Sequence, residues 1–286
     1  MLNIDLHCHS NVSDGVLPPR EVVARAAANG VHVFALTDHD DVAGLAEAQA
    51  AATEVGIDFI PGVEISVSWG GQTVHIVGLR VDPSHLGLSA GLAEIRTGRT
   101  ERAHRMAADL AKSGIEGAFE GASAYAANKH IIGRTHFARW LVAQRHAPDI
   151  RTAFKRFLTR GNPGHVEHVW TTLENAVNWI RASGGMAVVA HPGRYAFNAR
   201  ELHLFLDAFR ALGGEGIEVV TGSHHPSEYG KFADLARAFS LKASRGADFH
   251  APGEGIDIGR LPALPHYCRP VWQGWPETTR LQAVCN

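Results

Sequence analysis

The sequence is poor in cysteine, has no long apolar stretch and carries almost no net charge. Its three cysteines, Cys8, Cys268 and Cys285, form no C-x-x-C pair and no disulfide framework, which favours a reducing, cytoplasmic setting. No run approaches the ~20 apolar residues of a membrane span, and no basic and apolar leader opens the chain. From a net charge of −2, no general affinity for polyanions follows. We expect neither membrane attachment nor an obligate protein partner.

Histidine, in contrast, is abundant, with 18 residues in the chain. His7 and His9 follow a short apolar run from Leu2 to Leu6, which predicts a buried strand. Alternate residues of a strand point to the same face, so the two imidazoles lie together. Such a pair can chelate a divalent metal ion, but two alternating histidines also occur without any function. The decision between these readings depends on further ligands elsewhere in the chain.

Apolar, strand-like runs alternate with helical segments about seven times. The predicted strands span residues 2–6, 31–37, 58–64, 73–79, 185–192, 216–220 and 241–247. Helical patterns separate them, and the first begins at prolines 18 and 19 and stops at Gly30. This alternation predicts an α/β fold with a parallel sheet, which at this length forms a closed or nearly closed (β/α) barrel.

Candidate metal ligands lie at or near the ends of these strands, where the active sites of such barrels are found. They are His7, His9, Asp14, His39, Glu64, His75, His191, Asp248 and His250. A single histidine in an apolar strand is usually an ordinary core residue, whereas nine donors at equivalent positions indicate a metal site. His75 lies inside its strand, and we expect it to face the same central cavity.

A basic insert is predicted between two parts of the barrel. We place the first part at residues 1–81, the helical insert at 82–168, and the second part with a C-terminal tail at 169–286; helices are expected at 88–113, 133–146 and 149–158. From Arg96 to Arg160 there are thirteen lysines and arginines against five acidic residues, whereas the rest of the chain has 14 against 24. The insert is therefore either a solvated basic face or a cap over the barrel mouth that suits an anionic substrate.

Several residues of the insert are candidates for phosphate binding, because arginine forms bidentate hydrogen bonds with phosphate and helix starts attract anions. These predicted substrate-binding residues are Arg99, Arg102, Arg105, Arg134, Thr135 and His136. Three further residues beside the predicted ligands are candidate catalytic residues. Arg194 is expected to hold a phosphoryl group, and Asp38 and Asp40 either to move a proton or to orient a histidine.

The motifs His7-x-His9, Asp14, Thr37-Asp38-His39, Glu64, His75, His191-Pro192 and Asp248-x-His250 resemble those of the PHP (polymerase and histidinol phosphatase) family. The resemblance covers residues 1–79 and 185–250, and it implies a distorted (β/α)7 barrel with three divalent metal ions, Mn²⁺ before Fe²⁺ or Zn²⁺. It also implies the ligand sets, namely His7, His9, Glu64 and Asp248 for one ion, Glu64, His75 and His191 for a second, and Asp14, His39 and His250 for a third.

The helical insert is similar to that of the stand-alone subgroup with the TrpH-like proteins and the 3′,5′-nucleotide bisphosphate phosphatases. This similarity implies a phosphatase that removes the 3′-phosphate from a nucleoside 3′,5′-bisphosphate, such as adenosine 3′,5′-bisphosphate, to give AMP and phosphate. Alternatives are a 5′–3′ exonuclease on short RNA or DNA, a histidinol-phosphate-type phosphatase, an amidohydrolase, and a metal-stabilised nucleic-acid-binding module without catalysis. The few aromatic residues of the insert favour a small nucleotide over a long strand. The basic insert argues against an amidohydrolase, and the complete ligand set argues against a non-catalytic module.

Overall fold

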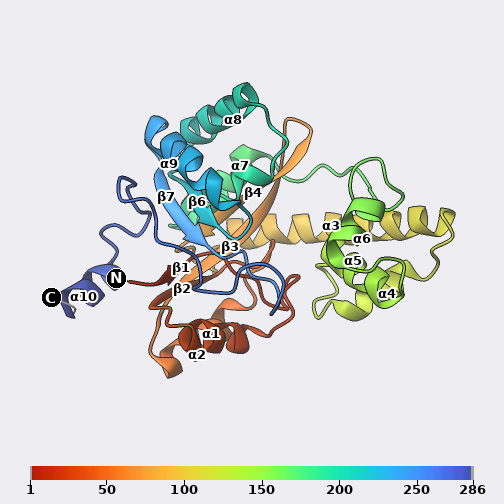
Figure 1. The fold of residues 1–286 in the computed structure, drawn as a ribbon, viewed down its shortest axis with the longest axis horizontal. Helices are drawn as coiled ribbons and strands as arrows, with labels where there is room; N and C mark the ends of the chain where they lie inside the picture. Colours follow the sequence, from red (N-terminus) through yellow and green to blue (C-terminus); the bar gives the residue numbers. More distant parts are fainter. Residues whose placement is uncertain (1, 285–286) are drawn as a thin grey trace.

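The computed structural model describes residues 2–284 and contains one seven-stranded sheet that curls into a barrel (Figure 1). The strands follow in chain order: β1 (Ile4–Asp5), β2 (Val33–Leu36), β3 (Asp58–Trp69), β4 (Gln72–Leu79), β5 (Met186–Val189), β6 (Gly216–Thr221) and β7 (Lys242–Gly246). Backbone hydrogen bonds join the first and last strands, since Leu6 N donates to Arg245 O at 3.0 Å and Asp248 N donates to His7 O at 2.8 Å. The predicted distorted (β/α)7 barrel is confirmed.

The expectation of a wholly parallel sheet is wrong, because β4 runs antiparallel to both β3 and β5. Gly70 and Gly71, with φ of 55° and 74°, form a tight turn that pairs Trp69 with Gln72. Two positive φ angles in succession suit a two-residue hairpin, for which two adjacent glycines are a sequence signal. β4 therefore starts at the barrel mouth, and His75, near its start, lies level with the C-terminal ends of the parallel strands.

Helices cover the outside of the barrel. They are α1 (Pro19–Ala28) and α2 (Leu45–Val55) on one side, and α7 (Leu173–Ala182), α8 (Ala199–Ala211) and α9 (Tyr229–Ala238) on the other (Figure 1). Each buries one apolar face, as α1 does with Val22, Val23 and Ala26. The C-terminal tail, which ends in α10 (Pro276–Val284), packs Val271 and Trp275 into an apolar cluster with β1. The tail thus lies against the barrel.

The cap, residues 82–168, forms a separate group of helices. It contains α3 (Leu86–Lys112), α4 (Ala118–Tyr125), α5 (Arg134–Ala143), α6 (Ile150–Ala153) and a π-helical turn, Phe154–Leu158. Helix α3 projects from the barrel, and the other cap helices gather around its far half (Figure 1). They share an apolar cluster of their own that includes Met106, Phe137 and Leu141. Helix α4 was not predicted, and the boundaries at 82 and 168 stay a prediction.

Two sequence expectations concern the surroundings of the protein. Over residues 2–284, no helix combines the length and apolar character that crossing a bilayer requires. Cys8 and Cys268 are free thiols, and Cys285 lies outside the described residues. The cytoplasmic location stays a prediction from the sequence.

Candidate active site

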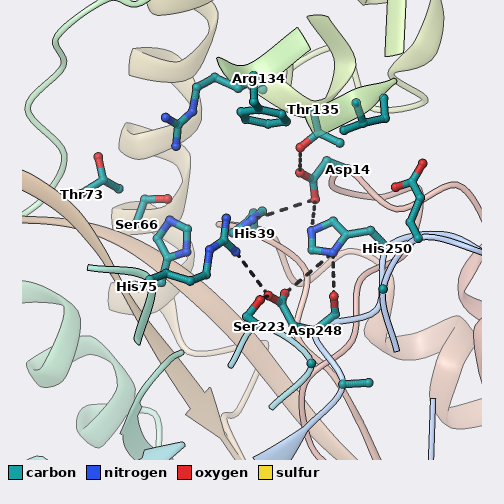
Figure 2. Close-up of a pocket in the computed structure, with 18 of the residues that line it drawn as sticks. Asp14, His39, Ser66, Thr73, His75, Arg134, Thr135, Ser223, Asp248 and His250 are labelled. Atoms are coloured by element: carbon teal, nitrogen blue, oxygen red, sulfur yellow. Dashed lines mark hydrogen bonds and ion pairs between the residues drawn. The ribbon is translucent and has the colours of Figure 1, made fainter. Parts of the chain in front are cut away.

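A cavity of about 290 Å³ lies between the barrel mouth and the cap (Figure 2). Asp14, His39, His75, Asp248 and His250 line its barrel end. Side chains from the cap and from the segment that follows it line the opposite end, namely Arg99, Arg102, Arg134, Ile150, Phe154 and Trp170, and Thr135 of the cap lies between the two ends beside Asp14. The structure thus gathers residues far apart in the sequence around one space.

The first group of metal-capable side chains comprises His7, His9, Glu64 and Asp248. His7 Nε2 and His9 Nε2 lie 3.3 and 3.2 Å from Glu64 Oε2. The same two nitrogens lie 3.5 and 3.3 Å from Asp248 Oδ1. Gly246 permits this packing, because a Cβ there would come within 2.3 Å of the His7 Cβ. These four residues are the first ligand set that the family resemblance implies.

Glu64 also lies at the centre of a second group with His39 and His75. Its Oε2 is 2.9 Å from His39 Nδ1, and its Oε1 is 2.9 Å from His75 Nδ1. His191 Nε2 lies at the same distance, 2.9 Å, from Oε1. The structure therefore brings Glu64, His75 and His191 together as expected, and it adds His39 to them.

The third group comprises His9, Asp14, His39 and His250. Asp14 Oδ1 lies 3.2 Å from His250 Nε2, 3.9 Å from His39 Nε2 and 4.0 Å from His9 Nδ1. His9 was not expected in this group. Because His9, His39 and Glu64 each belong to two groups, the nine donors form one continuous cluster.

The chemistry of this cluster fits divalent metal ions. Six imidazoles and three carboxylates are a mixed donor set that suits Mn²⁺, Fe²⁺ or Zn²⁺. Five buried atoms of the cluster make no hydrogen bond to any other described residue: Asp14 Oδ1, His39 Nδ1, Glu64 Oε2, His75 Nδ1 and His191 Nδ1. Burial raises the pKa of Glu64, but the neighbouring histidines, first His39, outweigh burial and hold it well below its usual value. Glu64 is therefore an anion in the interior, ready to accept a cation.

Glu218, on β6, holds two members of the cluster and was not identified from the sequence. Its buried carboxylate accepts a hydrogen bond from His7 Nδ1 at 2.8 Å and from the His191 backbone N–H at 2.6 Å. With Glu218 as the acceptor, Nδ1 of His7 is the donor and Nε2 faces the metal donors. The bond from the His191 N–H to Glu218 helps to hold His191 at an unusual φ of 25°. A carboxylate within a fully buried strand is the signal that could have revealed it.

Asp38 and Asp40, the predicted catalytic carboxylates, do not line the cavity. Asp38 accepts hydrogen bonds from the hydroxyls of Ser10 and Ser13, each at 2.6 Å, and so shapes the loop that carries Asp14. Asp40 accepts a bond from Arg99 Nε at 2.6 Å. Both carboxylates are thus engaged in holding neighbouring segments.

The predicted phosphate-binding arginines of α3 differ from one another. Arg99 is paired with Asp40, and its Nη2 also donates to Ser66 Oγ at 2.7 Å. Arg102 is buried and forms no salt bridge with any carboxylate in the described part of the chain; its guanidinium lies 5.5 Å from the centroid of the Trp170 ring. Burial, followed by repulsion from Arg134, lowers the pKa of Arg102 to about 9. Arg105 is exposed and lies outside the cavity lining.

The three predicted phosphate-binding residues at the start of α5 also differ in their contacts. Arg134 lines the cavity, with its guanidinium 5.9 Å from the centroid of the Phe154 ring, and burial lowers its pKa to about 10. Thr135 Oγ1 donates to Asp14 Oδ2 at 2.8 Å. His136 is buried outside the lining, and its Nδ1 accepts a bond from Gly133 N at 3.0 Å. Of these three residues, Arg134 faces the cavity with a free charge.

Arg194 lines the cavity next to the metal donors. Its side chain is half exposed, and Nη1 donates to Asp248 Oδ2 at 3.3 Å. The hydroxyl of Ser223, which sequence reasoning missed, donates to the same oxygen at 2.5 Å. Figure 2 shows Arg134 across the cavity from Ser223 and Asp248. The cavity therefore has cationic groups at both ends and metal donors at one.

Known proteins share this sequence and fold. The profile of the PHP domain matches residues 5–184. The chain is 54% identical over 274 residues to a 3′,5′-nucleoside bisphosphate phosphatase of Chromobacterium violaceum, with 96% of each chain covered. It is 41% identical over 269 residues to a 5′-3′ exoribonuclease of Haemophilus influenzae, with 94% of this chain and 97% of that one covered.

A solved structure described as an amidohydrolase from Chromobacterium violaceum, with bound sulfate and no metal, matches with a TM-score of 0.93 at 52% identity. The match covers 98% of this chain and 96% of that one. Because the PHP domain match spans more than half of the sequence, the chain belongs to the PHP domain family.

Proposed function

We propose that this protein is a metal-dependent phosphatase that removes the 3′-phosphate from a nucleoside 3′,5′-bisphosphate, such as adenosine 3′,5′-bisphosphate, giving AMP and phosphate. The observation that carries the proposal is the polarity of the cavity, with metal donors at one end and buried arginines at the other. A nucleotide with two phosphates has one anion for each end. The phosphatase of Chromobacterium violaceum, over half identical to this chain, supports the same substrate class.

The barrel end is proposed to hold three divalent ions, with Mn²⁺ as the first choice and Fe²⁺ or Zn²⁺ as alternatives. The three donor groups, joined by His9, His39 and Glu64, support this number. Bound there, such ions supply positive charge to phosphoryl oxygens and lower the pKa of water, which phosphate ester hydrolysis requires.

Arg194 is proposed to orient the phosphoryl group that is cleaved. Its guanidinium lies at the wall beside Asp248, uses one N–H group there, and keeps others for a phosphoryl oxygen. Asp38 and Asp40 are proposed to position the Asp14 loop and the cap, because their carboxylates are engaged away from the cavity. This assignment differs from both roles expected from the sequence, proton transfer and the orientation of a histidine.

Arg102 and Arg134 are proposed to bind the remote phosphate. Burying a guanidinium without a counter-charge is costly, as the lowered pKa of Arg102 shows, and an anionic ligand relieves that cost. Phe154 and Ile150 add an apolar wall beside Arg134 that suits the sugar and the base. Arg99, already neutralised by Asp40, is proposed to shape this subsite with only part of its charge available.

A second candidate function is a 5′–3′ exonuclease on short RNA, and the relative from Haemophilus influenzae named an exoribonuclease favours it. The two activities are separated by assaying manganese-loaded protein on adenosine 3′,5′-bisphosphate, AMP, histidinol phosphate and a 5′-phosphorylated oligoribonucleotide. Release of phosphate and 5′-AMP from the bisphosphate, with little from the others, is the expected result. Faster release of mononucleotides from the oligonucleotide would favour the exonuclease.

The proposal that the two ends of the cavity bind the two phosphates is tested by Arg102→Ala. We expect KM for adenosine 3′,5′-bisphosphate to rise about 10- to 100-fold, because a charge-assisted hydrogen bond contributes roughly 1.5–3 kcal/mol. KM for a 3′-monophosphate, which lacks the remote anion, should change little. Equal losses on both substrates would show that Arg102 does not read the second phosphate.

A further inference from the structure

Asp14 differs from the other donors of the cluster because a loop, and not a strand end, carries it. The loop follows His9, and Asp38 holds it through Ser10 and Ser13. These bonds fix the backbone of the loop before Asp14 and do not touch the Asp14 carboxylate. The orientation of this carboxylate must therefore come from elsewhere.

Two residues of the cap helix α5 hold Asp14, one at its carboxylate and the other at its backbone carbonyl. Thr135 Oγ1 donates to Asp14 Oδ2 at 2.8 Å (Figure 2). Arg139 Nη1 donates to the Asp14 carbonyl at 2.7 Å. Thr135 and Arg139 are four residues apart, so they lie on one face of the helix. Asp14 Oδ1, the oxygen that Thr135 leaves free, is buried and makes no hydrogen bond within residues 2–284. It points instead into the group of His9, His39 and His250.

We propose that Thr135 and Arg139 are positioning residues that orient Asp14 as a metal ligand, so that the cap completes one metal site of the barrel. This site is the group of His9, Asp14, His39 and His250. A partner that orients a ligand in this way typically changes metal affinity by about 10- to 100-fold. Within residues 2–284 the other two donor groups contain no residue that forms a hydrogen bond with α5, so we expect a smaller effect on them, passed on through the shared His9 and His39.

The same helix couples this metal site to the substrate. Arg134, which faces the cavity, directly precedes Thr135, so an anion that binds Arg134 restrains the start of the helix that also carries the hydroxyl on Asp14. Linkage then requires that the ion and the anion strengthen each other's binding by the same factor. This step rests on the proposed function for the identity of the anion, whereas the orientation of Asp14 does not.

The test compares Thr135→Val, which removes the hydroxyl at nearly constant volume, with Thr135→Ser, which keeps it. Mn²⁺ binding to metal-free protein is followed by the electron paramagnetic resonance signal of free Mn²⁺, without substrate. Thr135→Val should weaken one class of bound ion about 10- to 100-fold and the others less, and Thr135→Ser should bind like the parent protein. Binding of every ion by Thr135→Val at parental affinity would overturn the proposal.

A second variant and a measurement with added AMP complete the test. Arg139→Lys keeps a cation near Glu254 but cannot make the same bond to the Asp14 carbonyl, and it should weaken the same class of ion. Adding AMP should tighten that class in the parent protein and less so in Thr135→Val. Equal tightening in both proteins would refute the coupling through α5. The measurement of Mn²⁺ binding without AMP uses no nucleotide. Its result therefore stands even if the protein does not hydrolyse the proposed substrate.

Discussion

The barrel mouth and the cap both bury charge, and they differ in how that charge is matched. At the barrel mouth the carboxylates lie among histidines, which hold the pKa values of Glu64, Asp14 and Asp248 well below the usual range although burial raises them. In the cap, burial lowers the pKa of Arg102 to about 9, and no carboxylate of the described chain pairs with it. One region is built to receive cations and the other to receive an anion.

Where the two regions meet, each one contributes a residue to the other. Asp40 of the barrel pairs with Arg99 of the cap, and Thr135 of the cap orients Asp14 of the barrel. These contacts fix the distance between the metal end and the anion end of the cavity. In the proposed function, the cap would select the substrate and the barrel would carry out the chemistry, and both would depend on these contacts at their boundary.

The largest expected effect tests the barrel side, through Glu64→Gln. Glu64 lies within 3.3 Å of donor nitrogens from His7, His9, His39, His75 and His191. Removing its charge takes away the donor that two groups share, so turnover should fall by about 10³-fold or more and bound metal should decrease. Metal content and phosphate release are measured together. Glu215→Gln, at an exposed glutamate paired with Lys242, is the matched control and should behave like the parent protein.

A smaller loss is expected from Glu218→Gln, which leaves every metal donor in place. The amide keeps one acceptor oxygen but turns N–H groups toward either His7 Nδ1 or the His191 backbone N–H, both of which are donors. Metal affinity or kcat should fall by about 10- to 100-fold. Metal titration and initial rates measure this loss. Parental values for both quantities would mean that His7 keeps its orientation without Glu218.

The sequence was a better guide to the barrel than to the cap, for a physical reason. Strand periodicity places a residue at a strand end and on a face, and all parallel strand ends meet at one edge, so the donors could be gathered without coordinates. Helix periodicity in the cap also gives a face, but not what that face meets. Thr135 and His136 were assigned to phosphate by their place at a helix start, whereas Thr135 meets Asp14 and His136 bonds to Gly133 N. Glu218 was not predicted as a site residue because its partners, His7 and His191, follow two other strands, β1 and β5.

The cap also differs from the barrel in its response to pH, through His136. Burial lowers the pKa of His136 to about 4, below the ordinary value of 6.5 that it has when unfolded. The unfolded chain thus takes up a proton as pH falls from 6.5 to 4 and the folded protein does not, so stability decreases across this window. Between pH 7 and pH 5 the loss from this residue is about 2 kcal/mol.

His136→Gln isolates this effect, because glutamine at this helix position can make the same bond to the Gly133 N–H without titrating. The free energy of unfolding, measured by denaturant titration at both pH values, should fall by about 2 kcal/mol less in the variant than in the parent. The barrel histidines titrate in both proteins and cancel in the difference. The same pH dependence in both would show that His136 is not buried in its neutral form.

The smallest expected effect sharpens the comparison within the cap itself, where Arg102 and Arg105 lie one turn apart on α3. Arg105 is exposed, its Nη2 lies 3.2 Å from His168 Nδ1, and water already solvates its charge. Binding an anion there gains little, because solvent screens exposed charges to a fraction of a kcal/mol. Arg105→Ala should therefore change KM for the bisphosphate less than about 2-fold, against 10- to 100-fold for Arg102→Ala.

Steady-state kinetics at two salt concentrations separate an effect of surface charge from binding by a buried guanidinium, since only the effect of surface charge disappears with added salt. A loss as large as that of Arg102→Ala would mean that total basic charge, and not a buried guanidinium, recognises the second phosphate.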